Sequence, residues 1–214
     1  MIKLKKTEIL ILILTLIYFI TAIFIYPYLS ETMATHWNAQ GVADGFSSKF
    51  LGIVIMPFFF AFIFVIYSIF SRTEYFKNKE MEKQFSNTIN LTVLFLFYIS
   101  ILSLIYNTRL IFNMNYFLIP GLGLLFIGIG HILKKIKTRN PFFGVRTPWT
   151  LLNQKVWEKT HKLGGQLFII LGFVVFFGIF FINYFFVFFL VALFAILITA
   201  FVYSYILYKK ENRN

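Results

Sequence analysis

The chain has 214 residues, of which 59% are hydrophobic and 21% aromatic, and its formal net charge is +12. Only 13% of the residues are charged, about half of the usual share for a soluble globular domain. There is no cysteine, which excludes disulfides, thiolate metal sites and cysteine nucleophiles. Apolar runs recur at about the twenty residues that a helix needs to cross roughly 30 Å of hydrocarbon. The composition therefore predicts a polytopic membrane protein.

Six transmembrane helices are expected, at residues 9–29, 50–70, 88–106, 116–133, 166–182 and 184–208. None of these ranges contains Asp, Glu, Lys or Arg, in agreement with a penalty of about 2.5–3.5 kcal/mol for such a residue at a helix centre. The last two ranges predict a helical hairpin with Asn183 near its turn, because one helix over both would be about twice as long as the bilayer is thick. We expect an N-terminal module, 1–71, and a C-terminal module, 72–214, that form one structural unit of the all-α class.

The basic residues predict the orientation in the membrane. All Lys and Arg except Lys49 and Arg109 lie at the two termini and in the loops 71–87 and 134–164. Because Lys and Arg accumulate in cytoplasmic loops, we expect a multi-pass protein of the cell membrane with both termini inside. The same placement argues against direct nucleic-acid binding, since the charge follows the inner face of the membrane.

One polar segment, HWNAQGVADG at 36–45, is expected to face outward. Its turn-forming residues predict a loop that folds back tightly; they are Asn38, Gly41, Asp44 and Gly45. His36 and Asp44 are candidates to hydrogen-bond to each other or to share a metal ion with Glu31. Since a zinc site usually has three or four protein ligands, capping of a compact loop is the simpler interpretation, and we predict neither a metal nor a cofactor.

A second polar segment, GVRTPWTLLNQKVWEKTHKLGG at 144–165, is expected to face the cytoplasm. Thr147 and Pro148 predict a helix start, as N-cap and first helical residue. On one continuous helix from Pro148, a stripe of residues with helical spacing is expected: Trp149, Asn153, Trp157, Thr160, His161 and Gly164. We therefore add one cytoplasmic interfacial helix to the fold.

Two interpretations of this segment remain open. Trp anchors and basic residues are typical of a helix on anionic lipid. Lipid binding requires neither Asn153 nor His161, however, so the stripe also suits packing against a polar partner. Gly164 and Gly165 permit close approach of a backbone or a hinge, and Arg146 is suited to bind a phosphate or a carboxylate.

Both segments resemble signatures of the SdpI family of bacterial membrane immunity proteins. The outward HWNAQGVADGF resembles the family's His-x-Asn-x-x-Gly-x-x-Asp-Gly box, and NPFFGVRTPWTLLNQKVWEKTHKLGG resembles its C-terminal signature. The outward motif positions are His36, Asn38, Gly41, Asp44 and Gly45. The inward positions are Gly144, Arg146, Thr147, Pro148, Trp149, Asn153, Trp157, Thr160, His161, Gly164 and Gly165.

The resemblance implies protection of the cell against a secreted peptide toxin of the SdpC type, which would meet the outer face. It also implies signalling, in which a cytoplasmic repressor protein is held at the inner face. Two alternatives come from the residues. A membrane-interfacial metal-dependent hydrolase would have to use His36, His131 and His161, which the expected topology places on opposite sides. A small transporter usually has ionisable groups within its spans, and the expected spans have none. We expect no enzymatic activity.

Overall fold

A computed structural model describes residues 3–108, 110, 112–140 and 142–212. Arg109 and Arg213, which entered the prediction of the orientation, lie outside the described residues. Six of the described helices are long and apolar enough to cross a membrane, so the expected all-α, multi-pass class is confirmed. The chain divides into two compact units, Met1–Gly121 and Leu122–Asn214.

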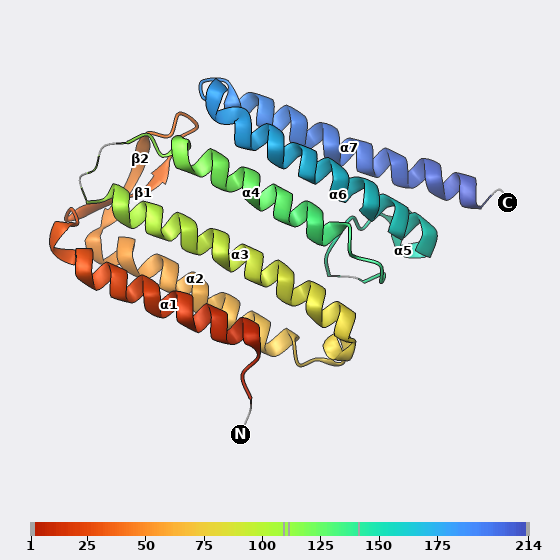
Figure 1. The fold of residues 1–214 in the computed structure, drawn as a ribbon, viewed down its shortest axis with the longest axis horizontal. Helices are drawn as coiled ribbons and strands as arrows, with labels where there is room; N and C mark the ends of the chain where they lie inside the picture. The colour runs from red at the N-terminus through yellow and green to blue at the C-terminus, as the bar shows by residue number, and fades with distance from the viewer. Residues whose placement is uncertain (1–2, 109, 111, 141, 213–214) are drawn as a thin grey trace. The chain divides into compact units, whose positions relative to one another are not determined.

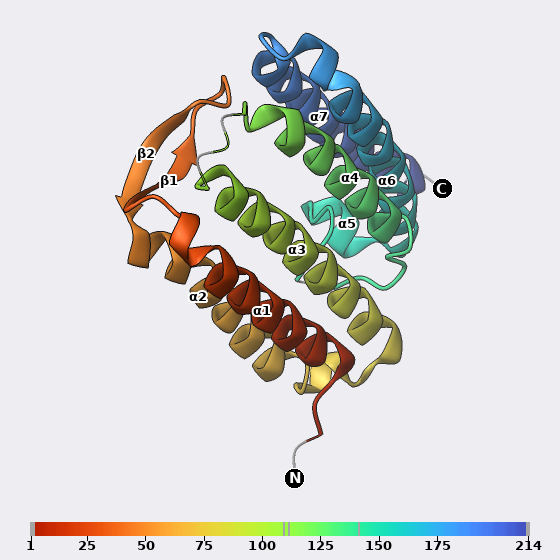
Figure 2. The same ribbon diagram turned by 60° about the vertical axis from the view of Figure 1, so that its left-hand side comes forward.

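Three long helices form most of the first unit. They are α1 (Lys6–Ile25), α2 (Lys49–Phe70) and α3 (Lys79–Tyr106), followed by the start of α4 (Asn115–Leu133). Figures 1 and 2 show α1, α2 and α3 running side by side. Their contact is apolar, with Ile11, Phe60, Val93 and Leu104 in its buried cluster. Other faces of α1 expose Ile23 and neighbouring large apolar side chains, as expected for a helix in lipid.

A β-hairpin joins α1 to α2, where the sequence had predicted only a tight loop. After a 3-10 turn (Tyr26–Tyr28), β1 (Thr32–Trp37) pairs antiparallel with β2 (Ala43–Ser48). The register is irregular between Ala34 and Trp37. The hairpin follows α1 and precedes α2, so it lies at the end of the unit opposite the N-terminus (Figure 1).

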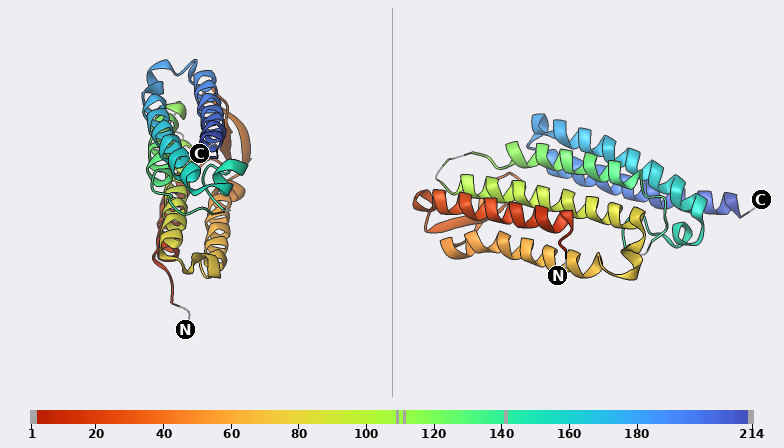
Figure 3. Two further views of the ribbon diagram at one scale, coloured as in Figure 1. Left: turned by 90° about the vertical axis from the view of Figure 1, so that its right-hand side faces the viewer. Right: turned by 60° about the horizontal axis from the view of Figure 1, so that its bottom comes forward.

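The second unit contains the rest of α4, the short α5 (Pro148–Leu152), α6 (Gln154–Phe177) and α7 (Phe185–Glu211). Figure 3 shows α6 and α7 as a long helical pair. The predicted hairpin between the last two spans is confirmed, with a 3-10 turn (Gly178–Phe181) before the connection that contains Asn183.

Glycines allow α4 and α6 to approach at backbone distance. A Cβ added to Gly130 would lie 2.6 Å from the carbonyl oxygen of Gly165, and one added to Gly123 would lie 2.7 Å from that of Gly172. The close approach that was expected at Gly165 is therefore present, as contact between two transmembrane helices, in the manner of small residues at membrane helix interfaces.

The expected continuous helix from Pro148 to Gly165 is wrong. Helix α5 ends at Leu152, and Asn153 has the extended conformation (φ −130°, ψ 123°) before α6 begins at Gln154. From there α6 runs without interruption past Gly164 and Gly165, so these glycines are not a hinge. The reason is local: the Asn153 side chain accepts hydrogen bonds from the N–H groups of Lys155 and Val156, which makes it an N-cap.

Candidate functional site

Two residues of the outward motif build the tip of the hairpin. Asn38 Oδ1 accepts from the N–H groups of Gln40 (3.0 Å) and Val42 (3.1 Å), and the Asn38 backbone N–H donates to the carbonyl of Val42 at 2.9 Å. Gly41 has a φ of +75°, which an L side chain rarely adopts. Asn38 and Gly41 are thus explained by the geometry of the turn.

The hairpin also presents an exposed His–Asp pair. His36 Nδ1 lies 2.5 Å from Asp44 Oδ1, and the two side chains are 71% and 45% exposed. Gly45 is opposite His36 in the ladder, and a Cβ there would lie 2.8 Å from His36 Cβ. Glycine therefore leaves room for the imidazole. Because a carboxylate only accepts, Nδ1–H is the donor of this contact, and the other ring nitrogen, Nε2, is left for a further contact.

An asparagine that the sequence analysis missed holds β1 in place. Asn107, at the end of α3, accepts from the Ala34 N–H at 2.7 Å and donates to the Ala34 carbonyl at 3.1 Å. Its amide thus takes the place that a neighbouring strand would have. Asn113 and Asn115 donate to the carbonyls of Gln40 and Ala39, at 2.7 and 2.9 Å. The available signal was three asparagines within nine residues, 107–115, between two apolar spans.

The inward motif is centred on a buried histidine. His161 is completely buried on α6 and stacks on Trp157, with ring centroids 4.1 Å apart. Its Nδ1 lies 2.8 Å from the Trp157 carbonyl, and its Nε2 accepts from the Val145 N–H at 3.0 Å. Because a carbonyl only accepts, Nδ1 carries the proton and the imidazole is neutral. His161 thereby attaches the loop before α5 to α6.

Gly144 is the residue that permits this contact. Its φ is +108°, and a Cβ at this position would lie 2.2 Å from His161 Nε2. Glycine is therefore required twice, for the backbone conformation and for the space.

A chain of hydroxyl groups closes the start of α5. The side chain of Thr147, the predicted N-cap, accepts from the Thr150 N–H, which confirms the helix start with Pro148 at the first helical position. Thr147 Oγ1 also lies 3.0 Å from Ser204 Oγ of α7. Trp149 packs against the rings of Phe201 and Tyr205 on α7 at 5.0 Å. Trp149 thus contacts α7, whereas Trp157 contacts His161, and the expected single stripe is divided between two helices.

Two buried polar atoms of this site have no hydrogen-bond partner among the described residues: Trp157 Nε1 and Thr160 Oγ1. Both side chains are fully buried, and Gly164 is buried on the same helix. The exposed face of α6 is instead formed by Gln154, Lys155, Glu158, Lys159 and Lys162. Arg146 is exposed as well. The motif therefore has a buried half around His161 and an exposed basic half.

A buried acidic residue was missed in the first unit. Glu8, 1% exposed near the start of α1, accepts from Arg72 through both carboxylate oxygens (2.6 and 2.9 Å) and from Ser68 Oγ at 2.5 Å. Glu8 raises the pKa of Arg72, mainly through this hydrogen bond. Lys5 beside it donates to Glu82 on α3 at 2.5 Å. These contacts join the N-terminal end of α1 to α2 and α3. An acidic residue three positions into an apolar helix was the signal.

The described residues contain no group of three or more His, Cys, Asp or Glu that could hold a metal ion. The three histidines lie in different surroundings: His36 on the hairpin, His161 in its buried site, and His131 exposed on α4 with Nδ1 2.8 Å from the Ile127 carbonyl.

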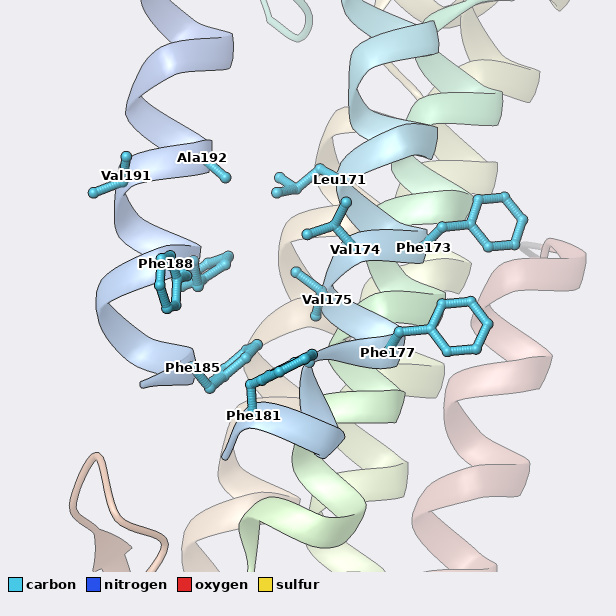
Figure 4. A pocket seen from close by; sticks show the side chains of 12 residues that line it. Leu171, Phe173, Val174, Val175, Phe177, Phe181, Phe185, Phe188, Val191 and Ala192 are labelled. Carbon is cyan, nitrogen blue, oxygen red and sulfur yellow. The ribbon is translucent and has the colours of Figure 1, made fainter. Parts of the chain in front are cut away.

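An apolar gap of about 730 Å³ separates parts of α6 and α7. Figure 4 shows Leu171 and Val175 of α6 and Phe185 of α7 directed into it, whereas Phe173 and Phe177 point away. This gap lies between two apolar helices, and its lining residues offer no polar side chain that would orient a ligand. It is therefore not a candidate site for specific ligand binding.

Comparison with known proteins finds a family match in each of the two units. Residues 136–206 match the model of the SdpI/YfhL protein family, and residues 12–61 match that of a domain of unknown function (DUF1648). The first match covers the inward motif and the second covers the hairpin. The chain is also 29% identical, over 171 residues, to a protein of Bacillus subtilis (strain 168) named immunity protein SdpI, covering 79% of this chain and 80% of that protein. No solved structure matches.

Proposed function

Since residues 136–206 match the model of the SdpI/YfhL protein family and the chain is 29% identical to an immunity protein over 79% of its length, we propose that it is a membrane immunity protein that protects its cell against a secreted peptide toxin of the SdpC type. The observation that carries this proposal is the His36–Asp44 pair, which the hairpin presents to solvent. The similar length of the Bacillus subtilis immunity protein, of which 80% aligns, supports one common role for the whole chain. This role is non-enzymatic binding.

The proposal includes an orientation in the membrane. The basic residues of the termini and of the loops 71–87 and 134–164 lie on the inner side by the charge rule for cytoplasmic loops. Both termini are then cytoplasmic, and the hairpin faces outward, where a secreted toxin arrives.

On the hairpin, the toxin contacts His36 and Asp44. The other motif residues act indirectly. Asn38 and Gly41 form the turn of the hairpin, and Gly45 leaves space beside the His36 imidazole. The pair presents the Asp44 carboxylate at the surface, which suits a ligand with donor groups or positive charge.

On the inner side, a cytoplasmic repressor protein binds the exposed basic half of the 144–165 segment. Arg146 and Lys162 are exposed there, whereas Trp157, Thr160 and His161 are buried and form the support. The same basic face contacts anionic lipid headgroups. Charge complementarity supports an acidic surface on the repressor.

A killing assay tests the outward half of the proposal. A toxin-sensitive bacterium expresses the full chain and is challenged with SdpC-type toxin, with His36→Ala and Asp44→Ala beside the wild type. Thr35→Ala is the matched control, since Thr35 is exposed on the same strand. We expect both variants of the pair to lose protection at unchanged membrane levels, and Thr35→Ala to keep it. Full protection by His36→Ala and Asp44→Ala would exclude the pair as the toxin contact.

A further inference from the structure

A buried lysine lies where α2 begins. The side chain of Lys49 is 10% exposed, and its Nζ lies 4.1 Å from the ring centroid of Tyr26. Glu31 Oε1 accepts from Nζ at a long distance of 3.2 Å, and the Glu31 side chain is 90% exposed. A solvated carboxylate compensates a buried ammonium group only weakly. An ammonium group has three donors, so Lys49 has the capacity to bind a second anion.

The positive potential at this point has a second source. Ser48 is the N-cap of α2, and its side chain accepts from the Leu51 N–H. The N-terminus of a long helix carries partial positive charge from its first N–H groups. Lys49 and the helix start therefore act in the same direction.

An apolar groove begins beside this lysine. It has a volume of about 400 Å³ and lies between α1 and α2, lined among others by Phe19, Ile23, Tyr26, Phe50 and Val54. The Tyr26 ring belongs both to the groove and to the contact with Lys49. One site thus combines a cationic side chain with an adjoining apolar groove on the surface of two transmembrane helices.

We propose that this site binds an anionic phospholipid, with the phosphate at Lys49 and one acyl chain in the groove. A helix about 10 Å in diameter would fill this volume with only about one turn, whereas an acyl chain is thin enough to run along it. The phosphate supplies the negative charge that the solvated Glu31 carboxylate provides only weakly to Lys49. The headgroup and the acyl chain are then bound by adjoining parts of one site.

Lipid binding to the full chain tests the proposal. Protein purified in detergent and stripped of lipid is titrated with phosphatidylglycerol or phosphatidylcholine of identical chains, and bound lipid is counted by native mass spectrometry. We expect the wild type to prefer phosphatidylglycerol about tenfold, as a charge-assisted contact implies. Lys49→Gln should abolish this preference, and Glu31→Gln should strengthen it by removing the competing carboxylate.

The groove is tested separately from the charge. Ile23→Trp fills the groove and should weaken the binding of both lipids several-fold. Ile20→Trp is the matched control, because Ile20 is exposed on the same helix and is not among the residues that line the groove. This pair of variants keeps the proposal testable even where Lys49→Gln fails to fold.

Three results would overturn the proposal: equal binding of the two lipids by the wild type, a preference that survives in Lys49→Gln, or equal binding by Ile23→Trp and Ile20→Trp. Inorganic phosphate, added as a competitor, distinguishes the source of the anion. Weak competition at millimolar concentration supports a lipid whose tail contributes. Complete displacement, together with no effect of Ile23→Trp, would assign the site to a free anion instead.

Discussion

Replacing Gly144 by alanine should disconnect the loop before α5 from α6. The backbone there has a φ of +108°, and the new Cβ would lie 2.2 Å from His161 Nε2. The ring has no simple way to move aside, since it stacks on Trp157 and is completely buried. The loop must therefore shift, and the hydrogen bond from the Val145 N–H to His161 is lost.

The expected cost has two parts. A residue other than glycine held at this φ costs about 1–3 kcal/mol. A buried polar atom left without its hydrogen bond costs about 1–3 kcal/mol more. The free energy of unfolding should therefore fall by about 2–6 kcal/mol. For a chain of this size, each kcal/mol lowers Tm by about 2–4 °C, so a decrease of at least about 4 °C is expected.

Thermal unfolding of the purified full chain, followed by tryptophan fluorescence, measures this cost. Gly164→Ala is the matched control, because its Cβ would meet the ends of two side chains, Leu133 at 3.2 Å and Val145 at 3.6 Å, and no backbone or ring atom. Alanine also gains about 1 kcal/mol of helix propensity. In a His161→Ala background the clash is absent, so Gly144→Ala should cost only its backbone strain. An equal cost in both backgrounds would refute the contact between residue 144 and the ring.

Two further changes separate structural contacts from incidental ones. Asn107→Ala should lower the free energy of unfolding by about 1–3 kcal/mol, because Ala34 loses a partner for both its N–H and its carbonyl. The rate of amide hydrogen exchange should rise in β1 and not in α6. Unchanged protection of the Ala34 amide would contradict this role of Asn107. Glu8→Gln should lower the free energy of unfolding by about 2 kcal/mol, because Arg72 loses a charged partner, whereas Glu82→Gln, at a carboxylate that is 36% exposed, should cost at most about 1 kcal/mol. Equal melting temperatures of these two variants would show that the burial of Glu8 does not matter.

The transmembrane helices could be predicted because the signal is additive over many residues. Twenty apolar side chains in succession outweigh any single contact, so all six spans were found, with one end of each close to its position in the structure. The polar extensions were missed, as at Lys79, where α3 begins. The division into modules 1–71 and 72–214 stays a prediction.

Contacts between distant residues could not be predicted. Nothing local reveals that the Asn107 amide pairs with Ala34, 73 residues away, or that Glu8 meets Arg72. The break at Asn153 was missed for a different reason. Helical spacing continues through this residue, but its side chain competes successfully for the next N–H groups. Periodicity records which residues share a face and not where a cap interrupts the helix.

The sequence also could not distinguish motif residues that contact a ligand from motif residues that hold the backbone in shape. Glycine and asparagine in a polar segment suit a binding loop as well as a turn. In the structure, Asn38 and Gly41 form the turn, and Gly144 leaves the space beside His161. The roles of His36 and Asp44 in toxin recognition remain proposals.

The Glu8–Arg72 pair has a consequence for biosynthesis. The two residues are 64 positions apart, so α1 is synthesised well before the arginine that neutralises its carboxylate. A lone charge near the end of a span opposes its release into lipid. The first helix therefore gains its stable position only when α2 arrives, and the two should leave the translocation channel as a helical pair. A truncated chain that ends before Arg72 should integrate less efficiently than one that extends beyond it.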